Sequence, residues 1–339
     1  MRVKTHSLAN TTPGRSPRAV SALQSTPHVQ SREPALAPAL DCERFAFNGL
    51  TCYVAGNGPP LVLVHSVNAA PSAAEVRPIF EHFRATRTVF AIDLPGFGLS
   101  TRADLPYNPR LMTDALHALA EHVQRRCGPA PIDALAVSLG CEFLARAAVE
   151  RPATWGRLAL VSPTGLNGTT PHRGPPGSVR TIPWLRAILM SGAWTQGLFG
   201  LLTRPAVMRH FLQRTWGSKA IDEPMWAYAV LSARQPGARF APLCFLSGSL
   251  FSKDIHQVYE SLSQPVWMSH GVRGDFADFR GMQLLRVGAN WHTTVYQTGA
   301  MPYFEMPAEF FREMGAFLAG DPGSAASARS AQAGQKNKA

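Results

Sequence analysis

An alternation of short apolar runs and longer amphipathic segments is the feature of this sequence that most constrains its fold. The apolar runs lie at 61–65, 88–93, 133–137 and 157–162, and the clearest amphipathic segment lies among them at 108–126. Parallel strands that are covered on both faces appear as continuous apolar runs, and helices connect them. The sequence therefore predicts an α/β fold with a mostly parallel central sheet and helices on both of its faces.

The run at 133–137 leads directly into a turn with a serine at its centre. The turn is Ala136-Val137-Ser138-Leu139-Gly140, and a helical pattern follows it. A sharp strand-to-helix turn requires small residues two before and two after the serine, because the backbone is strained there and neighbouring chains pass close. Such a turn lifts the hydroxyl out of the sheet, so Ser138 is the candidate nucleophile.

The alternation of strands and helices is interrupted between 164 and 263. This segment opens with a loop rich in Gly, Pro and Thr, then predicts several helices, and it holds four of the seven tryptophans. The strand pattern resumes at Pro265. We therefore expect a core formed by 41–163 and 264–320, with a helical cap inserted at 164–263. The aromatic residues of this cap either form its own small core or line an apolar pocket at the carboxyl ends of the strands.

The net charge of +11 is concentrated in the two ends of the chain. Residues 1–40 carry +4 and residues 321–339 carry +2, which leaves +5 for the remainder. That is an ordinary surface charge, so we expect no nucleic acid among the partners. Both ends have the composition of disordered segments, a basic leader at 1–40 and a tail at 321–339. An organellar transit peptide is the alternative interpretation of the leader; otherwise we expect a cytoplasmic protein.

The five cysteines form no CxxC pair and no metal-binding spacing. Their number is odd, which is typical of reduced, structural thiols in a reducing compartment, and Cys141 is expected to be a core thiol. No run of about 18 apolar residues is present, so we expect no membrane span. We expect neither a metal ion nor another cofactor, and the oligomeric state stays open.

Four stretches together resemble the α/β-hydrolase superfamily, in particular its small-esterase and haloperoxidase-like branch. They are the strand and loop at 61–66, the Asp-Leu-Pro-Gly-Phe-Gly turn that begins at Asp93, the serine turn with Ala136 in place of the first glycine of G-x-S-x-G, and the strand 265–271 followed by Asp275. The resemblance covers 60–163 and 264–319. It implies the α/β-hydrolase fold and a catalytic triad in the chain order serine, acid, histidine.

The same resemblance implies roles for individual residues. Ser138 matches the nucleophile, and Asp275 matches the acid of the triad, with Asp278 as the alternative. The backbone N–H groups of Leu139 and Val67 match the oxyanion hole, which stabilises the negative oxygen of a tetrahedral intermediate.

The histidine of the triad is missing. The family places it after the last strand, shortly before a Glu-x-Pro at the start of the last helix, and here that stretch is 297–307. The Gly-His pair of the family falls on Gly299-Ala300, so Ala300 occupies the histidine position. No histidine follows His292 in the chain, so the absence does not depend on the details of the match. A methyl group cannot transfer a proton.

Other residues near the expected site have structural interpretations. His65 and His270 end strands at the expected active edge of the sheet, but the matching family positions are usually structural. His292 begins the last strand, at the opposite end of the sheet. Asp275 has an alternative of its own, as a loop carboxylate that caps a helix or pairs with Arg273.

Three functions stay open for such a chain. The first is hydrolysis of a carboxylic ester or thioester with an apolar acyl group, in which Ser138 attacks and a non-standard base accepts its proton. The second is a catalytically inactive hydrolase fold that binds a ligand or a protein partner. The third is non-hydrolytic lyase or peroxidase-like chemistry. We expect the first, with a small apolar ester or acyl compound as substrate, because a nucleophile, an acid and oxyanion donors are all present.

Overall fold

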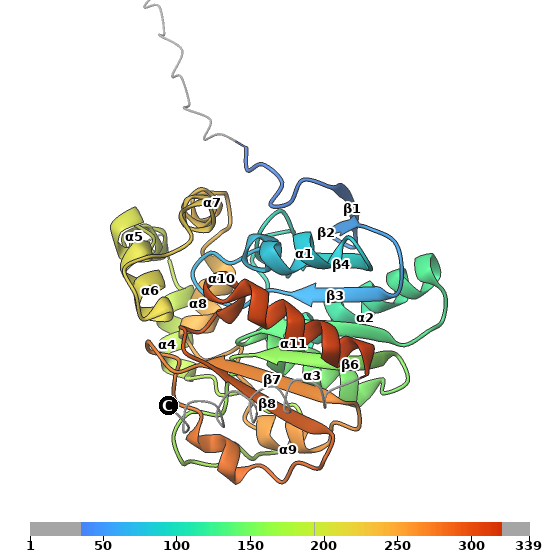
Figure 1. Cartoon of the computed structure of the whole chain (residues 1–339). Helices are drawn as coiled ribbons and strands as arrows, with labels where there is room; N and C mark the ends of the chain where they lie inside the picture. Colours follow the sequence, from blue (N-terminus) through green and yellow to red (C-terminus); the bar gives the residue numbers. More distant parts are fainter. Residues whose placement is uncertain (1–34, 193, 321–339) are drawn as a thin grey trace, which may run out of the picture. The chain divides into compact units, whose positions relative to one another are not determined.

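The computed structural model describes residues 35–192 and 194–320, which form a layered structure around one sheet (Figure 1). The sheet has eight strands in the order β1-β2-β4-β3-β5-β6-β7-β8. β2 is antiparallel to β1 and to β4, whereas all pairs from β4 to β8 are parallel. The strands are β1 (Glu43–Phe47), β2 (Leu50–Ala55), β3 (Pro60–Val64), β4 (Thr88–Asp93), β5 (Ile132–Val137), β6 (Trp155–Val161), β7 (Val266–Gly271) and β8 (Trp291–Tyr296). The prediction of a mostly parallel sheet is confirmed.

Alternate side chains of the buried strands pack into two separate cores, one on each face of the sheet. Val62 and Val64 of β3 belong to one core, and Leu61 and Leu63 belong to the other. The helices on the first face are α2 (Pro109–Cys127), α3 (Gly140–Glu150) and α9 (Ile255–Glu260), and those on the second face are α1 (Arg77–Phe83), α10 (Pro302–Glu305) and α11 (Pro307–Ala319). Both faces are therefore covered, as fully apolar strands require.

Three helical segments around the sheet are short or divided. The segment 72–84 divides into the 3₁₀ helix η1 (Ala73–Val76) and α1, because Pro78 fits only in the first turn of a helix. The segment 279–287 contains only a short 3₁₀ helix, η2 (Arg280–Leu284). The last helix divides into α10 and α11, and α11 begins at Pro307.

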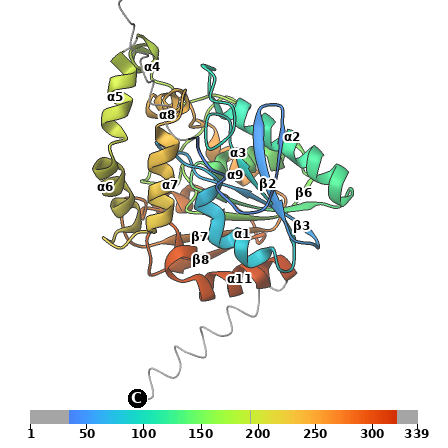
Figure 2. The ribbon, with the colours of Figure 1, turned by 90° about the horizontal axis from the view of Figure 1, so that it is seen from above.

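Six helices lie between β6 and β7, in the segment where we expected an insertion. They are α4 (Pro183–Met190), α5 (Trp194–Leu202), α6 (Pro205–Trp216), α7 (Glu223–Ala233), α8 (Phe240–Leu246) and α9. α4, α5 and α6 lie along one side of the molecule (Figure 2), whereas α9 packs against α3. A small third core joins Phe199, Met208 and Val230 of these helices to Ala70 in the loop after β3. None of the described helices is long and apolar enough to cross a bilayer.

Residues 35–40, at the end of the expected leader, contact the folded core. Leu36 and Leu40 are buried, and the N–H of Ala39 donates to the phenol oxygen of Tyr53 over 3.1 Å. Leu40 packs with the core on the second face of the sheet. Residues 1–34 and the tail 321–339 lie outside the described residues, so the transit peptide and the disordered tail stay predictions.

An ion pair joins α3 to the start of α9, and its removal tests how strongly α9 is held against α3. The side chains of Arg146 and Asp254 are nearly buried, with 2.6 Å between Nη2 and Oδ1. Asp254→Ala leaves the guanidinium buried and unpaired, so we expect the free energy of unfolding to fall by about 3 kcal/mol in urea denaturation. Glu121→Ala removes the exposed partner of Arg151 and should cost less than about 1 kcal/mol. Equal losses in the two variants would contradict this role.

Candidate active site

Ser138 lies in a sharp turn between β5 and α3. Its φ angle is 53°, in the left-handed region that residues other than glycine seldom adopt. The N–H of Ser138 donates to the carbonyl oxygen of Val161 over 2.8 Å, which ties the turn to the end of β6. A Cβ atom added at Gly140 would lie 2.5 Å from the carbonyl oxygen of His65, so only glycine fits there. The strained turn that the sequence predicts is therefore present, with the hydroxyl at the carboxyl edge of the sheet.

A cavity of about 410 Å³ lies over this turn. Its lining includes Ser138, Leu139, Val67, Asp275 and Ala300, so the candidate nucleophile, both candidate oxyanion donors, the first candidate acid and the residue at the histidine position are brought together. Most of the remaining wall is apolar and comes from the helices between β6 and β7. The aromatic part of the wall consists of Phe199, Phe211, Phe245, Phe251 and Phe276.

The N–H groups of Val67 and Leu139 are available to a ligand. Within the described residues, neither N–H donates a hydrogen bond to another part of the chain. Leu139 lies directly before α3, where the dipole of the helix favours negative charge. The two amides have the free donors that an oxyanion requires.

Glu75 is a residue of the site that the sequence reasoning missed. Its side chain is buried, lines the cavity, and accepts hydrogen bonds from the N–H of Ser66 over 2.9 Å and from the side-chain amide of Asn68 over 2.7 Å. Burial raises the pKa of this carboxyl. Because Val67 lies between its two partners in the sequence, Glu75 fixes the loop that carries one oxyanion donor. A carboxylate within a stretch of small apolar residues was the signal that could have revealed it.

Asp275 reaches the cavity but is held by an arginine. Its Oδ2 lies 2.5 Å from Nε of Arg214 on α6, and its Oδ1 lies 2.9 Å from Nη2. The alternative that Asp275 pairs with Arg273 is wrong, because Arg273 pairs with Glu305 instead. The carboxylate of Asp275 therefore links the loop after β7 to α6.

Asp278, the alternative acid, is not among the residues that line this cavity. It accepts a hydrogen bond from the N–H of Gly168 over 2.9 Å and pairs with Arg280, which holds the pKa of its carboxyl well below the ordinary range. Asp278 therefore holds the loop around Gly168 in place.

Ala300 is fixed against the cavity by backbone hydrogen bonds. The hydroxyl of Ser162 donates to its carbonyl oxygen over 2.7 Å, and its own N–H donates to the carbonyl oxygen of Thr215 over 3.0 Å. No histidine occurs among the described residues that line the cavity. The wall beside Ser138 thus carries a methyl group at the position that the resemblance gives to the histidine.

His65, His270 and His292 could in principle replace the missing triad histidine, but none of them lines the cavity. His65 is fully buried between the carbonyl oxygen of Ser66 and the N–H of Leu94, and burial lowers its pKa to about 4. His270 stacks on Phe279, with ring centroids 4.0 Å apart, and His292 is exposed on β8. His65 is therefore a neutral structural residue that ties the ends of β3 and β4 together.

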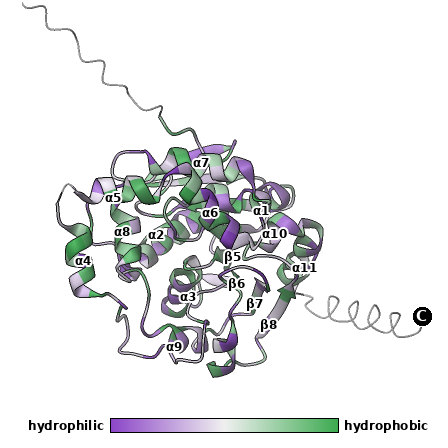
Figure 3. Cartoon of the chain, turned by 90° about the vertical axis from the view of Figure 1, so that its left-hand side faces the viewer, coloured by the Kyte–Doolittle hydropathy of each residue, from purple (hydrophilic) through white to green (hydrophobic). Residues whose placement is uncertain are grey.

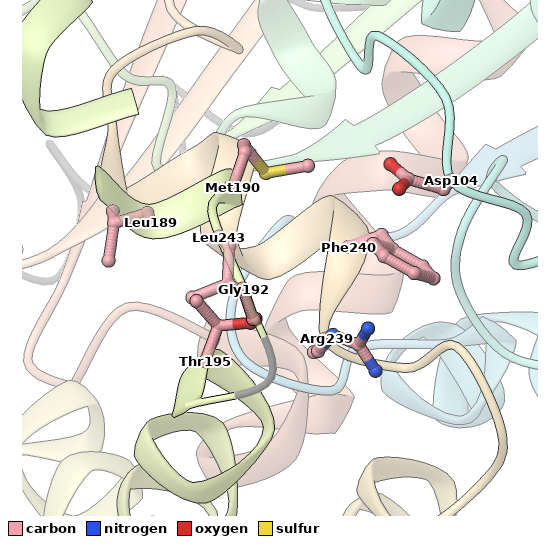
Figure 4. A pocket seen from close by; sticks show the side chains of 8 residues that line it. All are labelled: Asp104, Leu189, Met190, Gly192, Thr195, Arg239, Phe240 and Leu243. Carbon is pink, nitrogen blue, oxygen red and sulfur yellow. The ribbon is translucent and has the colours of Figure 1, made fainter. Parts of the chain in front are cut away.

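A second hollow, of about 220 Å³, lies between α4 and α8 (Figure 4). Asp104 and Arg239 are the charged residues of its wall, and it contains no serine, cysteine or histidine. The described residues also contain no group of three His, Cys, Asp or Glu side chains that could hold a metal ion. The cavity at Ser138 is therefore the better candidate for chemistry.

Comparisons with known proteins agree with this architecture. The model of a family described as "Alpha/beta hydrolase family" matches residues 61–313. The structure is similar to the epoxide hydrolase CorEH, with a TM-score of 0.63 and 20% identity over 82% of this chain and 98% of that one. It is also similar to CarC, a serine hydrolase involved in carbazole degradation, with a TM-score of 0.62 and 16% identity over 80% and 94%.

A third similar structure is the carboxylesterase CesB from Bacillus subtilis, with a TM-score of 0.60 and 15% identity over 83% of this chain and 93% of that one. The comparison with curated proteins gave no match. At such low identities, likeness to these structures shows the fold alone.

The burial of Glu75 generates a prediction about stability and pH. The pKa of its carboxyl is raised above the ordinary 4.5 in the folded state, so the folded chain keeps the proton to higher pH than the unfolded chain does. Its contribution to stability is present below pH 4.5 and is lost as pH rises through the raised value. Glu75→Gln removes this titration. We expect the stability of this variant relative to the wild type to increase between pH 4 and pH 8, measured by urea denaturation. A difference independent of pH would contradict the assignment.

Proposed function

Because this chain belongs to the alpha/beta hydrolase family, we propose that it hydrolyses a carboxylic ester or thioester with an apolar acyl group, with Ser138 as the nucleophile. The observation that carries the proposal is the position of Ser138, in a strained turn beside an apolar cavity with two free N–H groups. A strained turn costs free energy, and such strain is concentrated at functional positions.

In the proposed reaction, the oxygen of Ser138 attacks the carbonyl carbon of the substrate. The carbonyl oxygen becomes negative and accepts hydrogen bonds from the N–H groups of Leu139 and Val67. The alcohol or thiol then leaves, and water hydrolyses the acyl-serine. The phenylalanines of the cavity wall favour an apolar acyl group, because its burial removes apolar surface from water.

The proton of Ser138 needs an acceptor other than a histidine. Glu75 and Asp275 are the two carboxylates among the described residues that line the cavity, and Asp275 is neutralised by Arg214. We therefore assign the acceptor role to Glu75, directly or through one water molecule. Its raised pKa makes it a stronger base than an exposed carboxylate.

A ligand-binding protein without turnover is the second candidate function, and Ala300 is the observation that favours it. Loss of the general base lowers the rate by about two to four orders of magnitude in serine hydrolases. In that case the cavity would bind an apolar ligand and release it unchanged.

Labelling with a fluorophosphonate tests the nucleophile. We expect the probe to modify Ser138 in the intact protein, because attack on phosphorus uses the same hydroxyl and the same oxyanion donors. Mass spectrometry of the labelled peptide identifies the residue. Ser138→Ala should abolish labelling, and Ser162→Ala, a matched serine in the same cavity, should not. A folded wild type that resists the probe and does not cleave a short aryl ester would overturn the proposal.

Two substitutions distinguish a carboxylate base from an inactive site. If Glu75 accepts the proton, Glu75→Gln should lower kcat for an aryl ester by about a hundredfold or more, and the rise of the rate with pH should disappear. If the site is inactive, the wild type should be near the uncatalysed rate and Ala300→His should raise kcat by a similar factor. Steady-state kinetics from pH 4 to pH 9 measures both. A wild type that is active and unaffected by Glu75→Gln would contradict the role of Glu75.

A further inference from the structure

Large apolar side chains are exposed on one part of the molecule in particular. Half of the twelve exposed large apolar side chains in the described chain lie between 182 and 211. Trp184 and Ile188 are one turn apart on α4 and are 66% and 46% exposed, and Trp194 and Leu201 are two turns apart on α5 and are 50% and 49% exposed. Figure 3 looks onto this side, with α4, α5 and α6 facing the viewer. We call the exposed face of α4 and α5 the outer face.

α5 is apolar on both of its sides. Its inner side carries Phe199 and Leu202, which line the cavity, whereas Trp194 and Leu201 lie on the outer face. The helix contains no charged residue. Its polar side chains are Thr195 and Gln196, and Gln196 accepts a hydrogen bond from Arg239. An apolar side of a helix is normally covered, either by protein or by lipid. Trp194 and Leu201 on the outer side of α5 are therefore not covered by the apolar partner expected for such side chains.

The charge around the outer face is entirely positive in the sequence. Residues 180–216 contain five arginines and no aspartate or glutamate. Arg209 and Arg214 pair with acids from elsewhere, and Arg186 is turned toward Cys244 of α8. Within the described residues, Arg204 at the start of α6 is exposed and forms no ion pair. Exposed tryptophans together with an unpaired arginine are the composition of surfaces that lie in the headgroup region of a membrane.

We propose that the outer face docks on a lipid bilayer that contains anionic lipid. Trp184 and Trp194 would enter the boundary between headgroups and acyl chains, and Arg204 would bind a lipid phosphate. A second copy of the chain is a poorer occupant, because a two-fold pairing brings the same positive surfaces together. The leader 1–34 is a poorer occupant as well, since it carries five basic residues and one acid.

The position of the outer face has a consequence for substrate entry, which rests on the proposed function. Phe211 of α6 and Leu246 of α8 line the cavity and are 56% and 45% exposed, so they mark its mouth. α6 follows α5 along the chain, and α8 packs against α4. An apolar ester in the bilayer would therefore reach the cavity next to the docked helices, without passing through bulk water.

Vesicle flotation with the full-length chain tests the docking surface independently of catalysis. The chain is used as its Ser138→Ala variant, so that failure of the proposed chemistry cannot affect the result. We expect it to float with vesicles of phosphatidylcholine and phosphatidylglycerol, and less with phosphatidylcholine alone. Binding should weaken as salt is added, because salt screens the attraction between arginines and headgroups. Absence of binding to both kinds of vesicle would overturn the proposal.

Three further variants locate the binding surface. Trp184→Ser with Trp194→Ser should lower vesicle affinity by roughly tenfold or more, because two large apolar side chains no longer leave water. Arg204→Gln should lower affinity for the anionic vesicles by about fivefold. Leu105→Ser, at an exposed leucine outside the inserted helices, is the matched control and should bind as before.

Circular dichroism establishes that each variant is folded, and size-exclusion chromatography with light scattering measures its oligomeric state. Unchanged vesicle binding by the folded tryptophan variant would overturn the proposal. So would a wild-type dimer that the tryptophan substitutions dissociate and that binds neither kind of vesicle, because the outer face would then belong to an interface between copies.

Discussion

The site depends on the close packing of the serine turn against the end of β3. Gly140 approaches the carbonyl oxygen of His65 so closely that a Cβ atom would lie 2.5 Å from it. His65 in turn joins the loop after β3 to the start of the turn after β4, since its two ring nitrogens engage Ser66 and Leu94. The carboxyl ends of β4, β3 and β5 are thereby held together, and this packing places Ser138 beside the loop that carries Val67. The low pKa of His65 follows from the same burial, so His65 stays neutral and keeps these hydrogen bonds at physiological pH.

The backbone around Ala300 is closely packed and held by hydrogen bonds. Gly299 lies so close to the backbone of Trp216 that an added Cβ atom would meet it at 2.4 Å, and its N–H donates to Glu305 over 2.7 Å. Glu305 pairs with Arg273, and Arg214 holds Asp275. Asp275, the acid that the resemblance implies for a triad, is therefore paired with an arginine, and Ala300→His alone would create only part of the triad geometry that the resemblance implies. The increase in kcat measured for Ala300→His is consequently a lower limit for the increase that a complete triad would give.

The sequence was sufficient to predict the fold and the strained turn at Ser138, but not the contacts within the candidate site. Continuous apolar runs identify parallel strands, and small residues around Ser138 identify the turn, because both are local patterns. The pairing of Asp275 with Arg214 joins residues 61 positions apart, and no local pattern predicts it. Glu75 was missed because its function depends on burial and on its hydrogen bonds to Ser66 and Asn68, which exist only once η1 packs over the end of β3.

The proposed activation of Ser138 by a carboxylate and the proposed docking of the outer face on lipid support each other physically. A serine whose proton passes to a carboxylate reacts more slowly than one beside a histidine, so turnover depends more strongly on how much substrate is held in the right position. A cavity that opens at a bilayer meets apolar esters at the concentration they reach in lipid, which is far higher than their concentration in water. α5 connects the two properties directly, because Phe199 forms part of the cavity wall while Trp194 faces outward. A shift of this one helix on a lipid surface would therefore change the shape of the cavity above Ser138.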